Sequence, residues 1–155
     1  MRTLVLLATA GDVDAWDDRR LSIGHKAIPL PSVEIVERAP MIAQLIREVG
    51  FDLAEVVNPP IGILHDEAGK TYDVFHVEEA KGSPFIPAQD DFVIPYGIRS
   101  VVGFGGLMTS GEFFAVVMFA KTRVTTDSAV RFRNVALELK ASLFGLGGVP
   151  VFTGA

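Results

Sequence analysis

Residues 98–121 read IRSVVGFGGLMTSGEFFAVVMFAK, two apolar runs joined by the short polar link Thr109-Ser110-Gly111. A glycine in such a link is typical of the turn of a β-hairpin. A phosphate-binding loop would instead lead from a strand into a helix, because the free N–H groups at a helix N-terminus hold the anion. A second strand follows here. We therefore predict a hairpin, in which the glycines of GFGG mark a bulge, a bend or a close approach of another group to the backbone.

The segment before the hairpin alternates strand-like and helix-like patterns. Apolar residues without a helix breaker predict a strand at 3–10, and a shorter strand is expected at 26–30. Ser32 matches a helix N-cap, and the helical pattern of 33–49 contains Pro40. Because proline removes a backbone donor and clashes with the preceding turn, we expect either a kink or a second helix that begins near Pro40.

The middle of the chain carries a weaker signal. We expect an edge strand at 61–64 and a hairpin loop at 65–70. The β-favouring residues of 71–77 predict a further strand. Because side chains alternate along a strand, Phe75 and His76 should face opposite sides of the sheet.

Two further elements surround the hairpin. Residues 82–97 contain three prolines, and we expect them to form an ordered loop with a helical turn at 89–92. After the hairpin, residues 125–127 can cap a final amphipathic helix that ends near Gly145. Its predicted inward stripe has 3- and 4-residue spacing and consists of Phe132, Val135, Ala136, Leu139 and Leu143.

Composition narrows the class of protein. The chain has 155 residues, of which 49% are hydrophobic and 21% charged, as expected for one globular domain, here residues 1–148 with 149–155 as a tail or linker remnant. The net charge of -5 disfavours nucleic-acid binding, and the absence of cysteine excludes disulfides and thiol catalysis. The first apolar run is shorter than a signal peptide requires, so we expect a cytoplasmic protein with no membrane partner.

A strand SVVGFGGL, a glycine turn, a strand FFAVVMFA and a capped amphipathic helix follow one another over residues 96–144. This order resembles the C-terminal half of a GAF domain. The resemblance implies an α+β fold with a GAF/PAS-like central antiparallel sheet and helices packed on one face. It also implies a small-ligand pocket on the other face, closed by the loops before the hairpin.

The same resemblance implies a function in signal transduction. GAF domains include sensors for cyclic nucleotides, bilins, haem and small anions, and the lack of cysteine removes covalent bilin attachment and sulfoxide-reductase chemistry. We expect a small-molecule sensor, in a two-component system for example, that signals through its terminal helix to a histidine kinase or an effector domain. A second copy of the chain, in a homodimer, is a further expected partner. A haem-binding sensor and a structural or dimerisation domain without ligand are the alternatives.

The ligand is expected where a few polar groups converge on an apolar sheet face. A covering loop would contribute Trp16 and His25, and the predicted ligand residues on and beside the sheet are Phe75, His76, Tyr96, Ile98, Arg99 and Ser100. The Tyr96 hydroxyl, the Arg99 guanidinium and the main-chain N–H groups near Gly97 could together hold an anion or a carboxylate.

Each of these residues also has a purely structural interpretation. His76 could be satisfied by the backbone, Arg99 could pair with a surface acid, and Trp16 could fill the core. In the haem alternative, His76 would be the axial ligand. We predict no metal site, because no histidine pair has the short spacing of one, and no catalytic residue, because neither a nucleophile elbow nor an acid–base pair is found.

Overall fold

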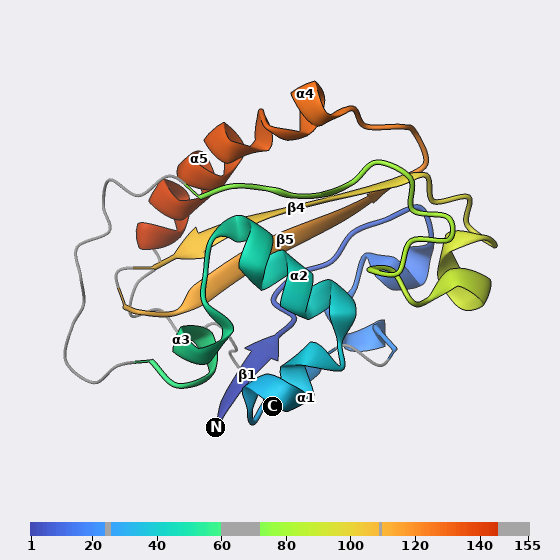
Figure 1. Cartoon of the computed structure of the whole chain (residues 1–155). Coiled ribbons are helices and arrows are strands. Elements are labelled where there is room, and N and C mark those ends of the chain that lie inside the picture. The colour runs from blue at the N-terminus through green and yellow to red at the C-terminus, as the bar shows by residue number, and fades with distance from the viewer. Residues whose placement is uncertain (24–25, 60–71, 109, 146–155) are drawn as a thin grey trace.

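The computed structural model describes residues 1–23, 26–59, 72–108 and 110–145 (Figure 1). The fold is α+β with antiparallel sheets, as predicted. The first sheet pairs β1 (Arg2–Val5) with β2 (Ala27–Leu30), and the second has the order β3 (Phe75–Val77), β4 (Ser100–Leu107), β5 (Phe113–Ala120). The helical elements are η1 (Asp14–Trp16), η2 (Arg19–Leu21), α1 (Val33–Glu37), α2 (Pro40–Val49), α3 (Leu53–Val57), η3 (Gln89–Val93), α4 (Thr126–Ala129) and α5 (Phe132–Phe144).

The predicted hairpin is formed by β4 and β5. Its register runs from Ser100 opposite Ala120 to Leu107 opposite Phe113. The Met108 N–H donates to the Glu112 carbonyl across 2.8 Å. Gly111 has φ 84°, a left-handed conformation that a side chain would disfavour, so the glycine of the link is required by the turn.

Helices cover both faces of the three-stranded sheet, and the prediction that they pack on one face is therefore wrong. Val101 of β4 belongs to the core beneath α2, whereas its neighbour Val102 packs with Ala136 of α5. Successive strand residues face opposite sides, so α2 and α5 sandwich the sheet (Figure 1). The face that the sequence analysis left open for a pocket is occupied by a helix.

The segment before the sheet is divided by Pro40, as expected. The helix α1 begins after Ser32, whose Oγ accepts the Ile35 N–H, and α2 begins at Pro40 itself. Gly50 ends α2 with φ 112°. The helix α3 was not predicted, because five residues are too few to produce a periodic pattern, and only the Asp52 cap marks it in the sequence.

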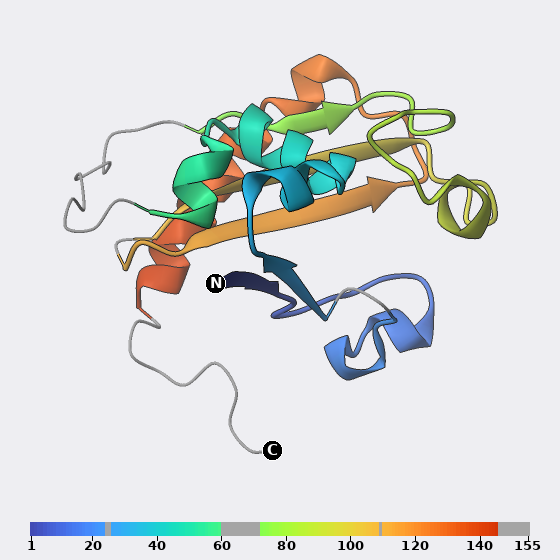
Figure 2. The ribbon, with the colours of Figure 1, turned by 60° about the horizontal axis from the view of Figure 1, so that its bottom comes forward.

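The strand β1 is shorter than the predicted 3–10. Its partner β2 extends from Ala27 to Leu30. Among the described residues, the pairing continues beyond it through the Leu6 N–H, which donates to the Lys26 carbonyl. Figure 2 shows the β1–β2 pair beneath β5. Leu4 and Ile28 pack from this small sheet against the core beneath α2.

The final helix is broken into α4 and α5 after Ala129. Thr125 caps α4 by accepting the Ser128 N–H. Ala136 of the predicted inward stripe is buried against the sheet, but Val135 is exposed. The tail 149–155 and the predicted elements at 61–64 and 65–70 lie outside the described residues.

The long connection between β3 and β4 is ordered around one side chain. Gln89 donates from Nε2 to the carbonyls of Ala80 and Ile86, and its Oε1 accepts the Gly82 N–H. The helical turn predicted at 89–92 is present as η3. No helix in the described part of the chain is long and apolar enough to cross a membrane.

Candidate functional site

Four aromatic side chains gather at one end of the β4–β5 hairpin. The Trp16 ring lies 4.7 Å from the Tyr96 ring and 5.9 Å from the Phe92 ring, measured between centroids. Phe92 also contacts Phe119 of β5 at 4.9 Å, edge to face. We call Trp16, Phe92, Tyr96 and Phe119 the aromatic cluster. Two of its members were predicted as ligand residues, Trp16 and Tyr96, and the structure brings them together.

Local contacts hold Trp16 over its partners. The Gly11 N–H donates to an Asp17 carboxylate oxygen at 3.0 Å, which closes the loop around the indole. A side chain on Gly11 would collide with that ring. The ring is half-buried, while Tyr96 retains 38% of its surface exposed and Phe119 retains 36%. The cluster is therefore a partly open apolar surface with a polar hydroxyl.

Two charged residues, Arg99 and Lys121, adjoin this surface through the main chain. Arg99 follows Tyr96 by three residues, and its N–H bonds to the carbonyl of Ala120, directly after Phe119. Its side chain is exposed and forms no hydrogen bond or ion pair within the described part of the chain. Lys121 pairs with Asp12 at 2.7 Å, and this hydrogen bond lowers the pKa of the Asp12 carboxyl. Within the described residues, Arg99 is thus a cation without a partner, three residues after Tyr96 of the cluster.

The predicted main-chain anion site is not available. The Gly97 N–H donates to the Ile94 carbonyl and the Ile98 N–H to the Val93 carbonyl, at 3.2 and 2.9 Å. The Arg99 N–H donates to the Ala120 carbonyl, so the main-chain N–H groups of residues 97, 98 and 99 all have acceptors. Any anion here would have to bind through side chains.

Phe75 and Ile98 cannot contact a ligand. Phe75 is fully buried beneath α2, and Ile98 lies in the same core. The prediction for these two residues is wrong, because helix α2 covers the sheet face on which Phe75 lies, and Ile98, which precedes β4, is buried in the same core. His25 lies outside the described residues.

His76 and Ser100 have structural roles on the opposite face. The His76 Nε2 lies 2.7 Å from the Val124 carbonyl oxygen, so this nitrogen carries the proton it donates. The buried Ser100 hydroxyl donates to the Thr122 carbonyl at 2.7 Å and accepts the Val124 N–H at 3.0 Å. Together they anchor the connection from β5 to α4. Ser100 is fully buried, so its predicted ligand role is wrong. The ligand role of the partly buried His76 stays a prediction, and a haem iron could reach this nitrogen only by breaking its hydrogen bond.

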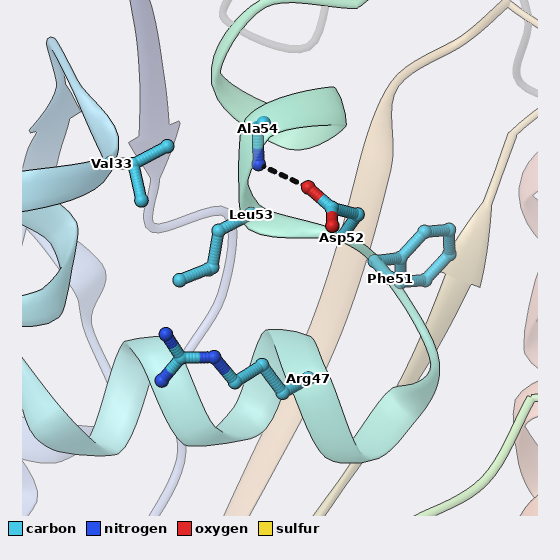
Figure 3. Close-up of a pocket in the computed structure, with 6 residues that line it drawn as sticks. All are labelled: Val33, Arg47, Phe51, Asp52, Leu53 and Ala54. Carbon is cyan, nitrogen blue, oxygen red and sulfur yellow. Dashed lines mark hydrogen bonds between the residues drawn. The ribbon is translucent and has the colours of Figure 1, made fainter.

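Two clefts lie elsewhere, on either side of α1. The first, of about 200 Å³, is lined by Val33, Arg47, Phe51, Asp52, Leu53 and Ala54 (Figure 3). Its charged groups are already engaged, since Arg47 pairs with Glu37 and Asp52 caps α3. The second, of about 270 Å³, lies between β2, α1 and α2.

None of the predicted ligand residues that the structure describes lines either cleft. The sequence analysis predicted neither cleft, because it expected a kink or a second helix near Pro40 but did not place residues 33–49 against a neighbouring element. A usable signal was present, however. The helix α1 carries more apolar surface than a single core-facing stripe requires, because its apolar residues lie on several of its sides. These residues are Val33, Ile35 and Val36.

The described residues contain no cluster of three or more metal-ligating side chains. The adjacent acids Asp17 and Asp18 have separate partners, since the Asp17 carboxylate accepts the Gly11 N–H and the Asp18 carboxylate pairs with Arg20. The hydrogen bond from Arg20 lowers the pKa of the Asp18 carboxyl to about 2.

Comparison of the chain with protein-family models, with curated proteins and with solved structures found no match.

Proposed function

We propose that the chain is a small-molecule-binding regulatory module of GAF-like type, whose ligand is a planar acid held at the aromatic cluster. The observation that carries the proposal is the edge-to-face contact of Trp16 with Tyr96, at an interplanar angle of 65°, which joins two partly open rings close in the fold to Arg99, a cation without a partner among the described residues. Aromatic faces bind planar groups, and a guanidinium binds a carboxylate through two parallel hydrogen bonds. A few polar groups on an apolar surface are typical of small-ligand sites.

Adjacent residues and hydrogen bonds connect the aromatic cluster to the terminal helix. Arg99 adjoins Ser100, and Ser100 holds Thr122 and Val124 at the start of the connection to α4. A ligand that moved Arg99 would therefore act on the hydrogen bonds that position α4 and α5. This route supports signalling through the terminal helix to a partner such as a histidine kinase or an effector domain.

The test uses Trp16, the single tryptophan of the chain, as a built-in fluorescent reporter. Native mass spectrometry of the freshly purified protein first identifies any co-purified acid. Benzoate and nicotinate are then titrated while Trp16 emission is recorded, with nitrate as an anion that lacks an aromatic ring. We expect saturable emission changes with the ring acids that nitrate does not reproduce.

Variants separate specific binding from surface quenching. Loss of a charge-assisted contact costs roughly 1.5–3 kcal/mol, so Arg99→Gln should weaken binding about tenfold or more. Arg131→Gln, at an exposed arginine of the α4–α5 junction, is the matched control and should bind normally. Equal affinities of Arg99→Gln and the unsubstituted protein would rule out this site.

One observation favours the alternative of a dimerisation domain. On α5, Leu137 and Phe144 remain 46% and 64% exposed, and with Ala141 they form a second stripe at 4- and 3-residue spacing. Such spacing is typical of helices that pair with one another. A concentration-dependent dimer that Leu137→Glu abolishes, together with no ligand in either assay above, would select this alternative.

A further inference from the structure

The cleft between β2, α1 and α2 is almost entirely apolar. Its lining residues are Ile28, Pro29, Leu30, Ile35, Val36, Arg38, Ala39 and Ile42. Leu30 and Val36 are buried and belong to the core of the molecule, whereas Ile35 remains 41% exposed. The cleft thus connects solvent with the hydrophobic core through apolar side chains from three elements.

Among the described residues that line this cleft, Arg38 is the charged one. It is exposed, and it makes no hydrogen bond or ion pair with any residue that the structure describes. The acids of α1 are engaged elsewhere: Glu37 pairs with Arg47, and the Ser32 hydroxyl lowers the pKa of the Glu34 carboxyl by hydrogen bonding to it. The cleft is therefore lined by apolar side chains and by one cation, Arg38, that pairs with no acid in the described part of the chain.

We propose that this cleft binds a linear amphiphilic carboxylate, with the alkyl chain in the cleft and the carboxylate on Arg38. The guanidinium fork matches a carboxylate, and the apolar lining matches a chain without polar groups. A group the size of a water molecule occupies about 30 Å³, so the cleft of about 270 Å³ holds about nine such groups. That capacity corresponds to a medium-chain acid such as octanoate.

This inference goes beyond the proposed function and is independent of it, because the cleft shares no residue with the aromatic cluster. Charge complementarity at Arg38 favours a carboxylate over a neutral hydrocarbon. It also favours a small amphiphile over a second copy of the chain, since the described cleft offers one cation and an apolar space of about 270 Å³. These other occupants become outcomes of the test.

Isothermal titration calorimetry of the full chain with butyrate, hexanoate, octanoate and decanoate, each below its micelle concentration, tests the proposal. Each methylene buried should raise the affinity roughly fourfold. We expect this increase up to about octanoate and then a plateau, because longer chains extend beyond the cleft. Octanol, the neutral analogue, should bind about tenfold more weakly than octanoate.

Two variants test the placement. Arg38→Gln should bind octanoate and octanol alike, and Ala39→Leu should abolish binding because the larger side chain fills the cleft. Arg131→Gln and Arg99→Gln should bind octanoate normally, which distinguishes this cleft from the aromatic cluster. Circular dichroism confirms that each variant is folded.

The proposal is overturned by any of three results. If the heat released on addition of octanoate did not saturate, the cleft would contain no specific binding site. Undiminished octanoate affinity in folded Arg38→Gln would remove the carboxylate contact. A lack of octanoate binding together with concentration-dependent self-association that Ile35→Glu abolishes would assign the cleft to a second copy of the chain.

Discussion

The Cδ1 atom of Leu45 lies 2.6 Å from the point that a Cβ atom would occupy on Gly103. Leu45 is buried in α2, and Gly103 is in the middle of β4, opposite Phe75 of β3. The missing side chain therefore allows α2 to approach the sheet closely. The glycine that first suggested a phosphate loop serves helix–sheet packing instead.

Gly103→Ala should destabilise the protein by about 1–3 kcal/mol, the usual cost of overpacking a core. The new Cβ would contact Leu45, and it would also lie 3.2 Å from the Phe75 Cβ. Urea unfolding measures the loss. Combining the change with Leu45→Ala should cost less than the sum of the two single changes, and additive losses would contradict this packing. Gly145→Ala, at a glycine with φ -68° and no close contact among described atoms, is the control within about 0.5 kcal/mol.

Gly105→Ala should be more harmful than Gly103→Ala. A Cβ on Gly105 would overlap the main-chain oxygen of Phe114 on β5. A side chain can rotate away from such a contact, but a paired strand cannot move without losing its hydrogen bonds. We therefore expect the larger loss of unfolding free energy here, without relief from Leu45→Ala. A smaller loss at position 105 than at 103 would show that β5 can shift at little cost.

Ser100→Ala should destabilise the protein by about 1–3 kcal/mol, because it leaves the Val124 N–H and the Thr122 carbonyl without their partner. Since His76 holds the same segment, the losses from Ser100→Ala and His76→Leu should not be additive. Hydrogen exchange at residues 122–126 should rise in both variants. Ser142→Ala, on the exposed surface of α5, should leave exchange in this segment unchanged.

Asp73 should contribute to the dependence of stability on pH. Its carboxylate accepts two hydrogen bonds from Arg133 of α5, which lower its pKa below the ordinary value of 3.8. A lowered folded-state pKa means that the contribution is complete well above 3.8 and is lost as pH falls through the lowered value. Both side chains are about half exposed, so the effect should be only about 0.2–1 kcal/mol.

Urea unfolding of Asp73→Asn and the unsubstituted protein from pH 7 to pH 2 measures this contribution. The two stabilities should differ most near neutral pH and converge in acid. A gap that is constant over the whole pH range would show that the pair does not act through ionisation. Addition of salt should narrow the gap at neutral pH, because exposed ion pairs are screened.

Local chemistry explains which parts of the fold could be predicted. The hairpin follows from its glycine link, the division at Pro40 from a missing backbone donor, and the turn at 89–92 from its flanking prolines. The candidate site was only partly predictable. Trp16 and Tyr96 do meet, but alternation along a strand shows only that Phe75 and His76 face opposite sides, not what covers each side.

The sequence by itself determined the hairpin, the division of the helical segment at Pro40, and that the glycines of β4 mark a bulge, a bend or a close approach of another group. Only the tertiary structure decided that α2 and α5 enclose the sheet from both faces, that Ser100 and His76 anchor a connection, and that Arg99 and Arg38 are without partners in the described structure. The physical reason is that local preferences depend on neighbours along the chain. Burial and pairing instead depend on contacts between segments distant in sequence, which no local pattern records.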